Sequence, residues 1–550
     1  MNSTPDNPPQ QEKPELNQQD RGRQIVVQAV LMALGTLTSR ILGLVRESLF
    51  AALFSRTVTD AWYVAFRLPN IFRRLFGEGS LSVAFVPVFV ETRLDPAGAL
   101  RSHRLVNGFY TLFFLGLAVL TAIGVIFPEP LLNLLLDENY HAVAGKFDLT
   151  VLMARIMFVY IFLVCTYAYF MAILNALGKF GLAAMAPTFF NVCMIMATLI
   201  PTTLLQWEGQ ALAWGVVVGG IVQAAVLIPS LKRNGYWPKF SLAWGDPDVR
   251  RVLRGMVPSL LGMGLLQITT LVNMRFASEF GEGPISFINL ADRLLELPLS
   301  LVSVSIGTAL LPTLSRMWTE GRKEQMSEAS NYYLRLNLYV CLPAAVGLLM
   351  LAEPIVELLF QRGKFTASEA LITANVVKIY SALIISTSLV RVFIPAYYAI
   401  KNTWLPAVIS GVCLVLHIGL APLLMREYGF YGLNFSSVAT SSFNFVLLAI
   451  FYRQFVGPFA WGRVLKSSLV FSLMALVMAG GLQVYGPLRE LFTGEAGIGF
   501  AGKLTSLLLA IFFGAVIYAA LSALFKVEEF QTTWETFGSK IRRRLGAKTR

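Results

Sequence analysis

Apolar residues lie along this chain in blocks of roughly 18 residues or more, separated by short polar segments. A helix needs about 20 apolar residues to cross the ~30 Å hydrocarbon core of a bilayer. The pattern predicts about 14 membrane-spanning helices and lacks the alternating segments of about ten residues typical of a membrane β-barrel. The predicted spans are 25–54, 59–92, 105–128, 150–176, 181–206, 209–231, 251–278, 284–316, 331–360, 368–400, 403–424, 429–453, 465–486 and 499–525.

The composition agrees with a membrane protein. The chain is 56% hydrophobic and 14% charged, whereas a soluble domain is about 45–50% apolar and about 25% charged. These values exclude a soluble enzyme, a secreted disulfide scaffold and a disordered protein. We therefore predict an all-α polytopic membrane protein. Its four cysteines lie inside apolar blocks without a CxxC pair, and we interpret them as small buried residues.

The basic residues occur mainly in every second loop, which predicts that both termini are cytoplasmic. The net charge of +13 (45 − 32) then reflects cytoplasmic loops and does not indicate nucleic acid. One loop on the predicted outer side departs from the pattern with Arg362 and Lys364. The basic loops carry Arg93, Arg101, Arg104, Lys179, Lys232, Arg233, Arg316, Arg322, Lys323, Lys401 and Arg463; the alternate loops carry Asp137, Glu138, Asp148, Glu279, Glu282, Glu490 and Glu495.

A weak internal repeat divides the chain. Phe-Val-Pro-Val at 85–88 and Leu-Leu-Pro-Thr at 310–313 end similar charged segments, with prolines 225 residues apart (312 − 87). Two parallel halves with a site between them are typical of some transporters. The predicted division is a disordered cytoplasmic tail at 1–23, an N-terminal lobe at 24–231, a basic cytoplasmic link at 232–250, a C-terminal lobe at 251–455, a further pair of spans at 456–525 and a basic cytoplasmic tail at 526–550.

Charged residues inside predicted spans are the candidate functional residues, because each costs a few kcal/mol in lipid and usually faces a cavity or a partner. The first span contains Ser39, Arg40 and Arg46. The two arginines lie about 120° apart on a straight helix, and a kink at Gly43 would turn both inward. The alternative is that they reach a membrane surface.

The second span carries a charged stripe. Four of its residues fall on one helix face, and Arg73 lies one step to the side with Asn70. The stripe either lines a cavity or forms internal ion pairs, such as Arg74 with Glu78, that only hold the helix in the bundle. The stripe consists of Asp60, Arg67, Arg74 and Glu78.

The eighth span carries mainly acids. Asp292 and Glu296 share a face with Asn289, and Arg293 can pair with Glu296 three residues on. This group either neutralises itself at a helix contact or serves as a gate. Because the N-terminal half supplies most of the arginines, the cavity favours an anionic substrate, and guanidinium pairs bidentately with phosphate.

The sequence contains no GxSxG or HExxH motif. A transporter is therefore favoured over an enzyme. The candidates are exporters of lipid-linked saccharides or of drugs, and the alternative class is a membrane enzyme or a non-transporting scaffold. An enzyme would need interfacial acids that hold Mg²⁺ beside a lipid phosphate, for which Asp137, Glu138 and Asp148 are candidates.

Three segments resemble the MurJ (MviN) lipid II flippase family of the MOP transporter superfamily: Ser-Arg-Ile-Leu-Gly-Leu-Val-Arg-Glu at 39–47, Thr-Asp-Ala-Trp-Tyr-Val-Ala-Phe-Arg-Leu-Pro-Asn at 59–70 and Arg-Arg-Leu-Phe-Gly-Glu-Gly-Ser at 73–80. The resemblance extends over residues 25–525 and includes Ala-Asp-Arg-Leu-Leu-Glu-Leu-Pro at 291–298. It implies two six-helix lobes around a central cationic cavity, with the last two helices forming a lipid-filled groove. It also implies export of the lipid-linked peptidoglycan precursor by alternating access.

The resemblance assigns roles to the charged residues named above. Arg40, Arg46, Arg73 and Arg293 would bind the pyrophosphate. Asp60, Glu78, Asp292 and Glu296 would form gating ion pairs. Ser39, Asn70, Arg67 and Arg74 would be additional cavity residues.

The resemblance also sets the expected surroundings. We expect lipid II, membrane lipids and cell-wall synthesis machinery as partners, the bacterial cytoplasmic membrane as location, and no cofactor. A sodium site in some relatives needs acids in the seventh and eleventh spans; because the seventh has only Glu279 at its very end, sodium coupling is not favoured, and the membrane potential stays open as the energy source. In the C-terminal tail, Phe530, Trp534, Phe537 and Ile541 at helical spacing predict contact with anionic lipid, the alternative being a solvated tail.

Overall fold

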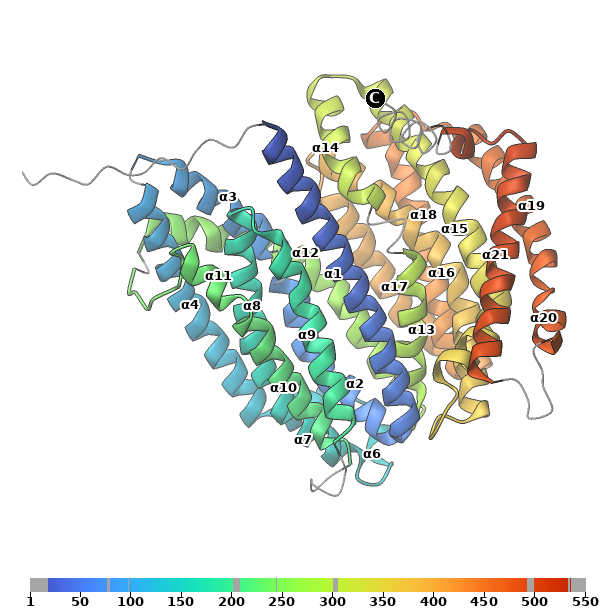
Figure 1. The fold of residues 1–550 in the computed structure, drawn as a ribbon, viewed down its shortest axis with the longest axis horizontal. Helices are drawn as coiled ribbons and strands as arrows, with labels where there is room; N and C mark the ends of the chain where they lie inside the picture. Colours follow the sequence, from blue (N-terminus) through green and yellow to red (C-terminus); the bar gives the residue numbers. More distant parts are fainter. Residues whose placement is uncertain are drawn as a thin grey trace, which may run out of the picture.

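The computed structural model describes residues 18–76, 80–96, 98–200, 208–243, 245–299, 305–491, 499–532 and 535. The described residues form helices joined by short connections, without a β-strand among them. Helix α1 (Gln18–Leu53) begins, and α21 (Phe500–Leu524) ends, at the same end of the bundle (Figure 1). We call this end proximal and the opposite end distal. Glu78, Trp534, Phe537 and Ile541 lie outside the described residues, as does most of the predicted N-terminal tail.

Ten helical segments among the described residues are long and apolar enough to cross a membrane. Their hydropathy alone accounts for these spans, because every backbone polar group in lipid must be satisfied within the helix. They are α4 (Gly98–Ile126), α7 with α8 (Lys146–Met157 and Val159–Ala176), α9 (Phe180–Thr198), α10 with α11 (Gln210–Ala225 and Ile228–Arg233), α15 (Lys323–Phe360), α16 (Ala367–Ala399), α17 (Trp404–Tyr428), α18 (Phe430–Phe455), α19 with α20 (Trp461–Leu482 and Tyr485–Leu491) and α21.

The remaining predicted spans, the first, second, seventh and eighth, also form helices. They contain the charged clusters, and they are absent from the set of purely apolar spans. The all-α polytopic fold of about 14 spans is therefore confirmed, with its polar helices set apart by composition. These helices are α1, α2 with α3 (Arg56–Leu75 and Leu81–Leu94), α12 (Pro247–Ser278) and α13 with α14 (Pro284–Leu299 and Ser305–Thr319).

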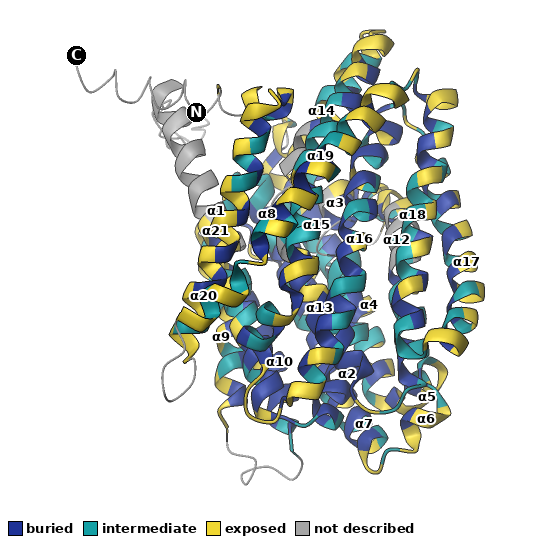
Figure 2. Ribbon diagram, turned by 90° about the vertical axis from the view of Figure 1, so that its right-hand side faces the viewer, coloured by how far each residue is buried: buried dark blue, intermediate teal, exposed yellow. Residues whose placement is uncertain are grey.

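Two predicted spans include residues outside the described ranges. The second is described as α2 and α3 on either side of residues 77–79, and the eighth as α13 and α14 on either side of residues 300–304. Pro69 in α2 and Pro298 in α13 each remove a backbone donor from their helix. Short connections complete the fold: α5 (Pro128–Leu135) and α6 (Glu138–His141) lie at the distal end, next to the start of α7 (Figure 2).

The helices pack as two groups that meet along α2 and α13. In the N-terminal half α1 packs on α9 and α2 packs on α7, while in the C-terminal half α15 packs on α16 and α17 on α18. Figure 2 shows buried residues concentrated on α2 and α7 and exposed residues on the outward faces of α17 and α20. The apolar side chains exposed on α19 and α21, such as Leu469, Leu473 and Phe512, are placed to face lipid.

The described part of the C-terminal segment packs against the bundle. Phe530 is half-buried against the apolar core of the C-terminal half. Arg335 on α15 holds the same segment through ion pairs to Glu528 (2.5 Å) and Glu529 (2.9 Å). A half-buried apolar side chain and a paired arginine therefore hold the chain after α21, and the predicted contact of the tail with anionic lipid stays a prediction.

Candidate functional site

A cavity of about 450 Å³ lies between α1, α2, α8, α9 and α13, and we call it the central cavity. Five arginines and one glutamate line it, which leaves an excess of positive charge (5 − 1 = +4). Most of the arginines come from α1 and α2, as the sequence predicts, and the C-terminal half adds one arginine and the glutamate. The charged lining residues are Arg40, Arg46, Arg73, Arg74, Arg293 and Glu296.

Arg46 is the most enclosed of the cavity arginines. Its residue is 3% exposed, and its Nη1 donates to Oδ1 of Asn191 on α9 at 3.1 Å. The guanidinium also lies 5.7 Å from the ring centroids of Phe50 and Trp62. Its Nε is buried without a hydrogen-bond partner. An arginine held on two sides with a spare donor is suited to bind an anion that enters the cavity.

Glu47 joins the two halves beneath the cavity, and the sequence analysis did not select it. Its carboxylate accepts from Arg46 Nη2 at 2.5 Å, lies 3.4 Å from Nε of Arg293 on α13 and accepts from the Tyr63 hydroxyl. It is 1% exposed. A signal was present, because Glu47 is an acid within the first span beside an arginine.

The other first-span residues also reach the cavity. Ser39 and Arg40 line it with Arg46, so the helix presents both arginines to one space. Arg40 Nη1 lies 3.5 Å from the backbone oxygen of Glu296. Asn191, which the sequence analysis missed, donates to the backbone oxygen of Ser39 at 2.9 Å. Because Asn191 is a neutral amide in an apolar helix, little in the sequence pattern indicated this role.

The stripe on α2 divides between two cavities. Arg73 Nε donates to Oδ1 of Asn70 at 2.9 Å, and both residues line the central cavity. Arg74 lines the central cavity and a smaller one of about 90 Å³, which we call the side cavity. Arg67 lines the side cavity and donates to Oδ1 of Asn289 on α13 at 3.1 Å.

The eighth-span charges lie across from α2. Arg293 Nη1 pairs with Glu296 Oε2 at 3.1 Å, which matches the spacing of three residues. Asp292 lines the side cavity with Arg67 and Arg74. The described candidates from α1, α2 and α13 therefore come together around two connected spaces, with the exception of Asp60.

Asp60 lies at the distal end and not at either cavity. It is fully buried, and its carboxylate pairs with Nζ of Lys146, also fully buried, at 2.8 Å. It also accepts from the backbone N–H groups of Gly283 (2.6 Å) and Ser286 (2.8 Å) at the start of α13. Gly283 has φ +105°, a conformation that favours glycine. Asp60 therefore ties α2 to α7 and to α13.

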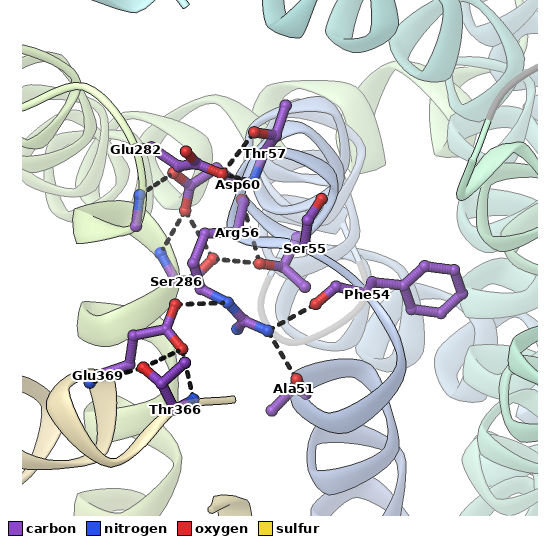
Figure 3. Close-up of polar contacts among 12 residues, drawn as sticks. Ala51, Phe54, Ser55, Arg56, Thr57, Asp60, Glu282, Ser286, Thr366 and Glu369 are labelled. Carbon is purple, nitrogen blue, oxygen red and sulfur yellow. Dashed lines mark hydrogen bonds and ion pairs between the residues drawn. The ribbon is translucent and has the colours of Figure 1, made fainter. Parts of the chain in front are cut away.

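More contacts surround this ion pair at the distal end. Figure 3 shows Arg56 between Glu369 and the backbone oxygens of Ala51 and Phe54; the distances are 3.2 Å to Glu369 and 2.6 Å to each oxygen. Thr57 donates its backbone N–H to Glu282 at 2.8 Å. We call this set the distal closure: Arg56, Thr57, Asp60, Lys146, Glu282, Ser286 and Glu369.

Contacts at the distal end also explain why the loop with Arg362 and Lys364 departs from the orientation pattern. Lys364 Nζ pairs with Glu208 at 2.6 Å, and its backbone N–H donates to the oxygen of Ala52 at 2.7 Å. Arg362 donates to the backbone oxygen of Leu358 at 2.6 Å. Lys364 therefore joins the two halves at the distal end.

A further crossing contact lies near Asp137. Arg275 at the end of α12 donates to its carboxylate at 2.5 Å. The backbone N–H of Asn139, followed by Arg275, lowers the pKa of Asp137 below its usual value. Burial raises the pKa of the neighbouring Glu279. The Asp137 carboxylate thus serves a contact between the halves, which argues against the Mg²⁺ role weighed above.

The fold and cavity define the class of protein. A helical bundle of two halves around a charged central cavity is a transporter architecture, and solved structures of MOP-superfamily transporters have a similar fold. One is similar over 80% of this chain and 99% of its own length, with 14% identity and a TM-score of 0.64; its title reads "Inward-facing conformation of a multidrug resistance MATE family transporter of the MOP superfamily".

Comparisons of sequence are more specific. The family model "Lipid II flippase MurJ" matches residues 49–500, and the chain belongs to this family of transporters. A probable lipid II flippase MurJ of Bdellovibrio bacteriovorus is 47% identical over 92% of this chain and 96% of its own length. The lipid II flippase MurJ of Burkholderia cenocepacia is 34% identical over 76% and 82%. A solved lipid II flippase MurJ in an inward closed conformation has 25% identity and a TM-score of 0.73, covering 90% of this chain and 98% of its own.

Proposed function

We propose that this chain moves lipid II from the cytoplasmic to the outer leaflet of the bacterial inner membrane by alternating access. The observation that carries the proposal is the central cavity, where five arginines face one glutamate inside a membrane bundle. Such an excess of guanidinium groups is suited to the pyrophosphate of a lipid-linked precursor. A cationic drug would meet repulsion there, so the multidrug alternative is not favoured.

The arginines have distinct parts in this proposal. Arg46, Arg40 and Arg73 bind the pyrophosphate, and Arg293 joins them from the other half. Because Arg46 and Arg293 both contact Glu47, phosphate would compete with Glu47 for them. Binding of substrate would thereby weaken a contact between the halves. Asp292 and Glu296 on the same helix as Arg293 would exchange ion pairs during the change of state.

A second, apolar cavity supports a path for the lipid tail. It has a volume of about 440 Å³ and lies between α15, α19 and α21. Pro298 at the end of α13 also lines it, and α13 carries Arg293 and Glu296 to the central cavity. One helix therefore touches both spaces, so that the charged head can occupy the central cavity while the tail stays in apolar surroundings. The remaining lining includes Tyr339, Leu348, Leu351, Met478, Leu482 and Tyr518.

The orientation proposal places the proximal end in the cytoplasm. The basic loops at residues 93–104, 316–323 and 463 and both termini then share one side, as the positive-inside rule requires. With this orientation the distal closure faces outward, and the described arrangement is closed on the outer side. Outward opening requires the Asp60 contacts to α13 to separate. The flipped precursor would be consumed by cell-wall synthesis machinery, and membrane lipids surround the bundle.

Complementation tests this function. A strain depleted of its own lipid II flippase would receive this protein or Arg46→Ala at matched membrane levels, with lipid II measured on each leaflet. We expect rescue by the wild type and accumulation of inner-leaflet lipid II with Arg46→Ala. Failure of well-expressed wild type would overturn lipid II as cargo. Rescue by both proteins would keep the cargo and remove Arg46 from phosphate binding.

A further inference from the structure

One histidine lies in the middle of a membrane helix, and the transport cycle proposed above makes no use of it. The chain has three histidines. His103 stacks on Tyr236 near the start of α4, and His141 stacks on Phe147 in the distal connection. His417 lies 13 residues into α17 (417 − 404), roughly 20 Å from its first residue, and is 1% exposed. A buried polar residue at this depth is a candidate functional site.

Both ring nitrogens of His417 are engaged, by two different helices. Nε2 lies 2.6 Å from Oδ1 of Asn273 on α12, and Nδ1 lies 2.9 Å from Oγ of Ser436 on α18. Nε2–H donates to the amide oxygen. The Ser436 hydroxyl can donate to a neutral ring, and it can turn to accept from a protonated one. The same heavy-atom arrangement thus accommodates the ring with or without an added proton.

A cavity links this group to the substrate path. A space of about 120 Å³ is lined by Asn273 together with Arg67, Asn289 and Asp292. The last three residues also line the side cavity, which shares Asn70, Arg74 and Arg293 with the central cavity. A water needs about 10–15 Å³ of such space, so the cavity has room for several. Because Asn273 both lines this cavity and bonds the ring, His417 is one side chain away from it.

The chemistry of this group does not suit sodium. The sodium site expected from some relatives needs acids in the seventh and eleventh spans, which are α12 and α17. In these helices acids occur only near the ends: Asp248 at the start of α12 and Glu427 at the end of α17. Hard cations such as sodium prefer oxygen ligands, whereas His417 presents its two ring nitrogens. Imidazole is instead the side chain that ordinarily gains and loses a proton near neutral pH.

The charged groups around His417 form ion pairs with other residues or lie across the cavity from the ring. Arg275 on α12 bonds Asp137, and Lys378 on α16 bonds Glu353. Taking up a proton therefore adds a charge with no carboxylate bonded to the ring among the described residues. The titratable residues that line the same cavity as Asn273 are Arg67, Asp292 and Tyr380. Those nearest the distal ends of the helices that hold the ring are Arg426 and Glu427 on α17 and Tyr431 on α18.

We propose that His417 is a proton-binding site whose loading and release are coupled to lipid II movement. Helix α12 packs on α3 and α4 of the N-terminal half and on α17 of the C-terminal half. A motion of α12 between the two states would therefore change the contact of Asn273 with the ring and the access of the ring to the cavity. Protonation in one state and deprotonation in the other would then link proton movement to the cycle. This inference rests on the proposed function.

The test uses the full chain in phosphatidylethanolamine–phosphatidylglycerol liposomes with fluorescent lipid II, pyranine inside, and the potential clamped with potassium and valinomycin. We expect lipid II movement in the wild type to be accompanied by a pyranine signal, to respond to an imposed pH gradient and to persist when choline replaces sodium. His417→Asn keeps a polar group but cannot take the proton, and it should lose the pyranine signal and the pH response. His103→Gln is the matched control and should retain both.

The outcomes separate the two proposals. Lipid II movement in the wild type with no proton signal, or a signal that His417→Asn retains, would overturn the proton site and leave the flippase function standing. Movement driven by a sodium gradient alone would overturn it as well. Absence of lipid II movement in the wild type under every gradient would overturn both. If His417→Asn does not fold, His417→Gln, which also keeps a hydrogen-bonding amide without the proton site, takes its place: loss of the pyranine signal supports the proton site and retention overturns it.

Discussion

The central cavity and the distal closure use the same kinds of charged residues with different charge balance. In the cavity, five arginines meet one glutamate around a space of about 450 Å³. In the distal closure each cation has an acid as its partner: Asp60 pairs with Lys146 and Arg56 with Glu369, while the third acid, Glu282, accepts from Thr57. Asp60 and Lys146 are fully buried. Paired and buried charges hold two surfaces together, because their partners replace water. Arginines in excess over acids keep an affinity for an anion. The difference indicates that the central cavity binds an anion and that the distal closure holds the two halves together.

The largest expected effect comes from breaking the buried ion pair between Asp60 and Lys146 in the distal closure. Lys146→Met leaves the Asp60 carboxylate buried without its cation, and removal of one partner of a buried pair costs about 3–5 kcal/mol. We expect a clear drop in melting temperature in detergent and faster labelling of a Thr57→Cys reporter by a membrane-impermeant maleimide. The double variant Asp60→Asn/Lys146→Met should recover part of the loss. Unchanged melting and labelling would show that this pair does not close the distal end.

A smaller change in stability and a larger change in transport are expected at the cavity. Arg46→Ala removes a proposed donor to the pyrophosphate, and a hydrogen bond to a charged group is worth about 1.5–3 kcal/mol, or roughly 10- to 100-fold in lipid II movement. Stability falls less than with Lys146→Met because Glu47 keeps Arg293 and Tyr63 as partners. Lipid II movement in liposomes and melting temperature would be measured side by side. Arg46→Lys, which keeps the charge but not the paired donors, should fall between. A loss of stability as large as that of Lys146→Met would remove the distinction between the regions.

The rim of the distal end should respond to acid. The pKa of Asp137 is held below its ordinary value by the backbone N–H of Asn139 and by Arg275. A carboxyl with a lowered pKa in the folded state adds stability above its unfolded value of about 3.9, and this stability is lost as the pH falls through the folded pKa. We expect Asp137→Asn to flatten the melting temperature between about pH 5 and pH 3. Asp148→Asn is the control. An equal acid response in both variants would contradict the assignment.

The smallest effect is expected at the proximal end. Glu91 on α3 pairs with Arg251 on α12 at 2.8 Å, and the two side chains are 52% and 57% exposed. Exposed pairs contribute about 0–1 kcal/mol. Glu91→Gln should therefore leave melting temperature and lipid II movement unchanged. A several-fold change in movement would mean that the proximal pair also works as a lock, and the contrast between buried and exposed charges would lose its meaning.

Some features of the site could be read from spacing, and others could not. Arg40, Arg46 and Arg73 were selected because a charge inside a span needs a cavity or a partner, and all three line the central cavity. Asp60 was placed in one stripe with Arg67, but seven residues of helix separate them by about 10 Å and put Asp60 in a different layer. Asn191 and Lys146 were missed because their roles come from residues on other helices. Glu47 was missed although it is an acid within the first span, and only its contact with Arg293 shows that it joins the two halves.

The sequence by itself determined the number and course of the helices and the sign of the cavity, because hydropathy and helix periodicity act over short distances. It also identified the charged helices α1, α2 and α13, which stand out by composition. Only the tertiary structure decided which charges are balanced. Asp60 meets Ser286 across 226 residues, Arg46 meets Asn191 across 145, and His417 meets Asn273 across 144. Such partners are set by how whole helices pack, and no local pattern encodes that packing.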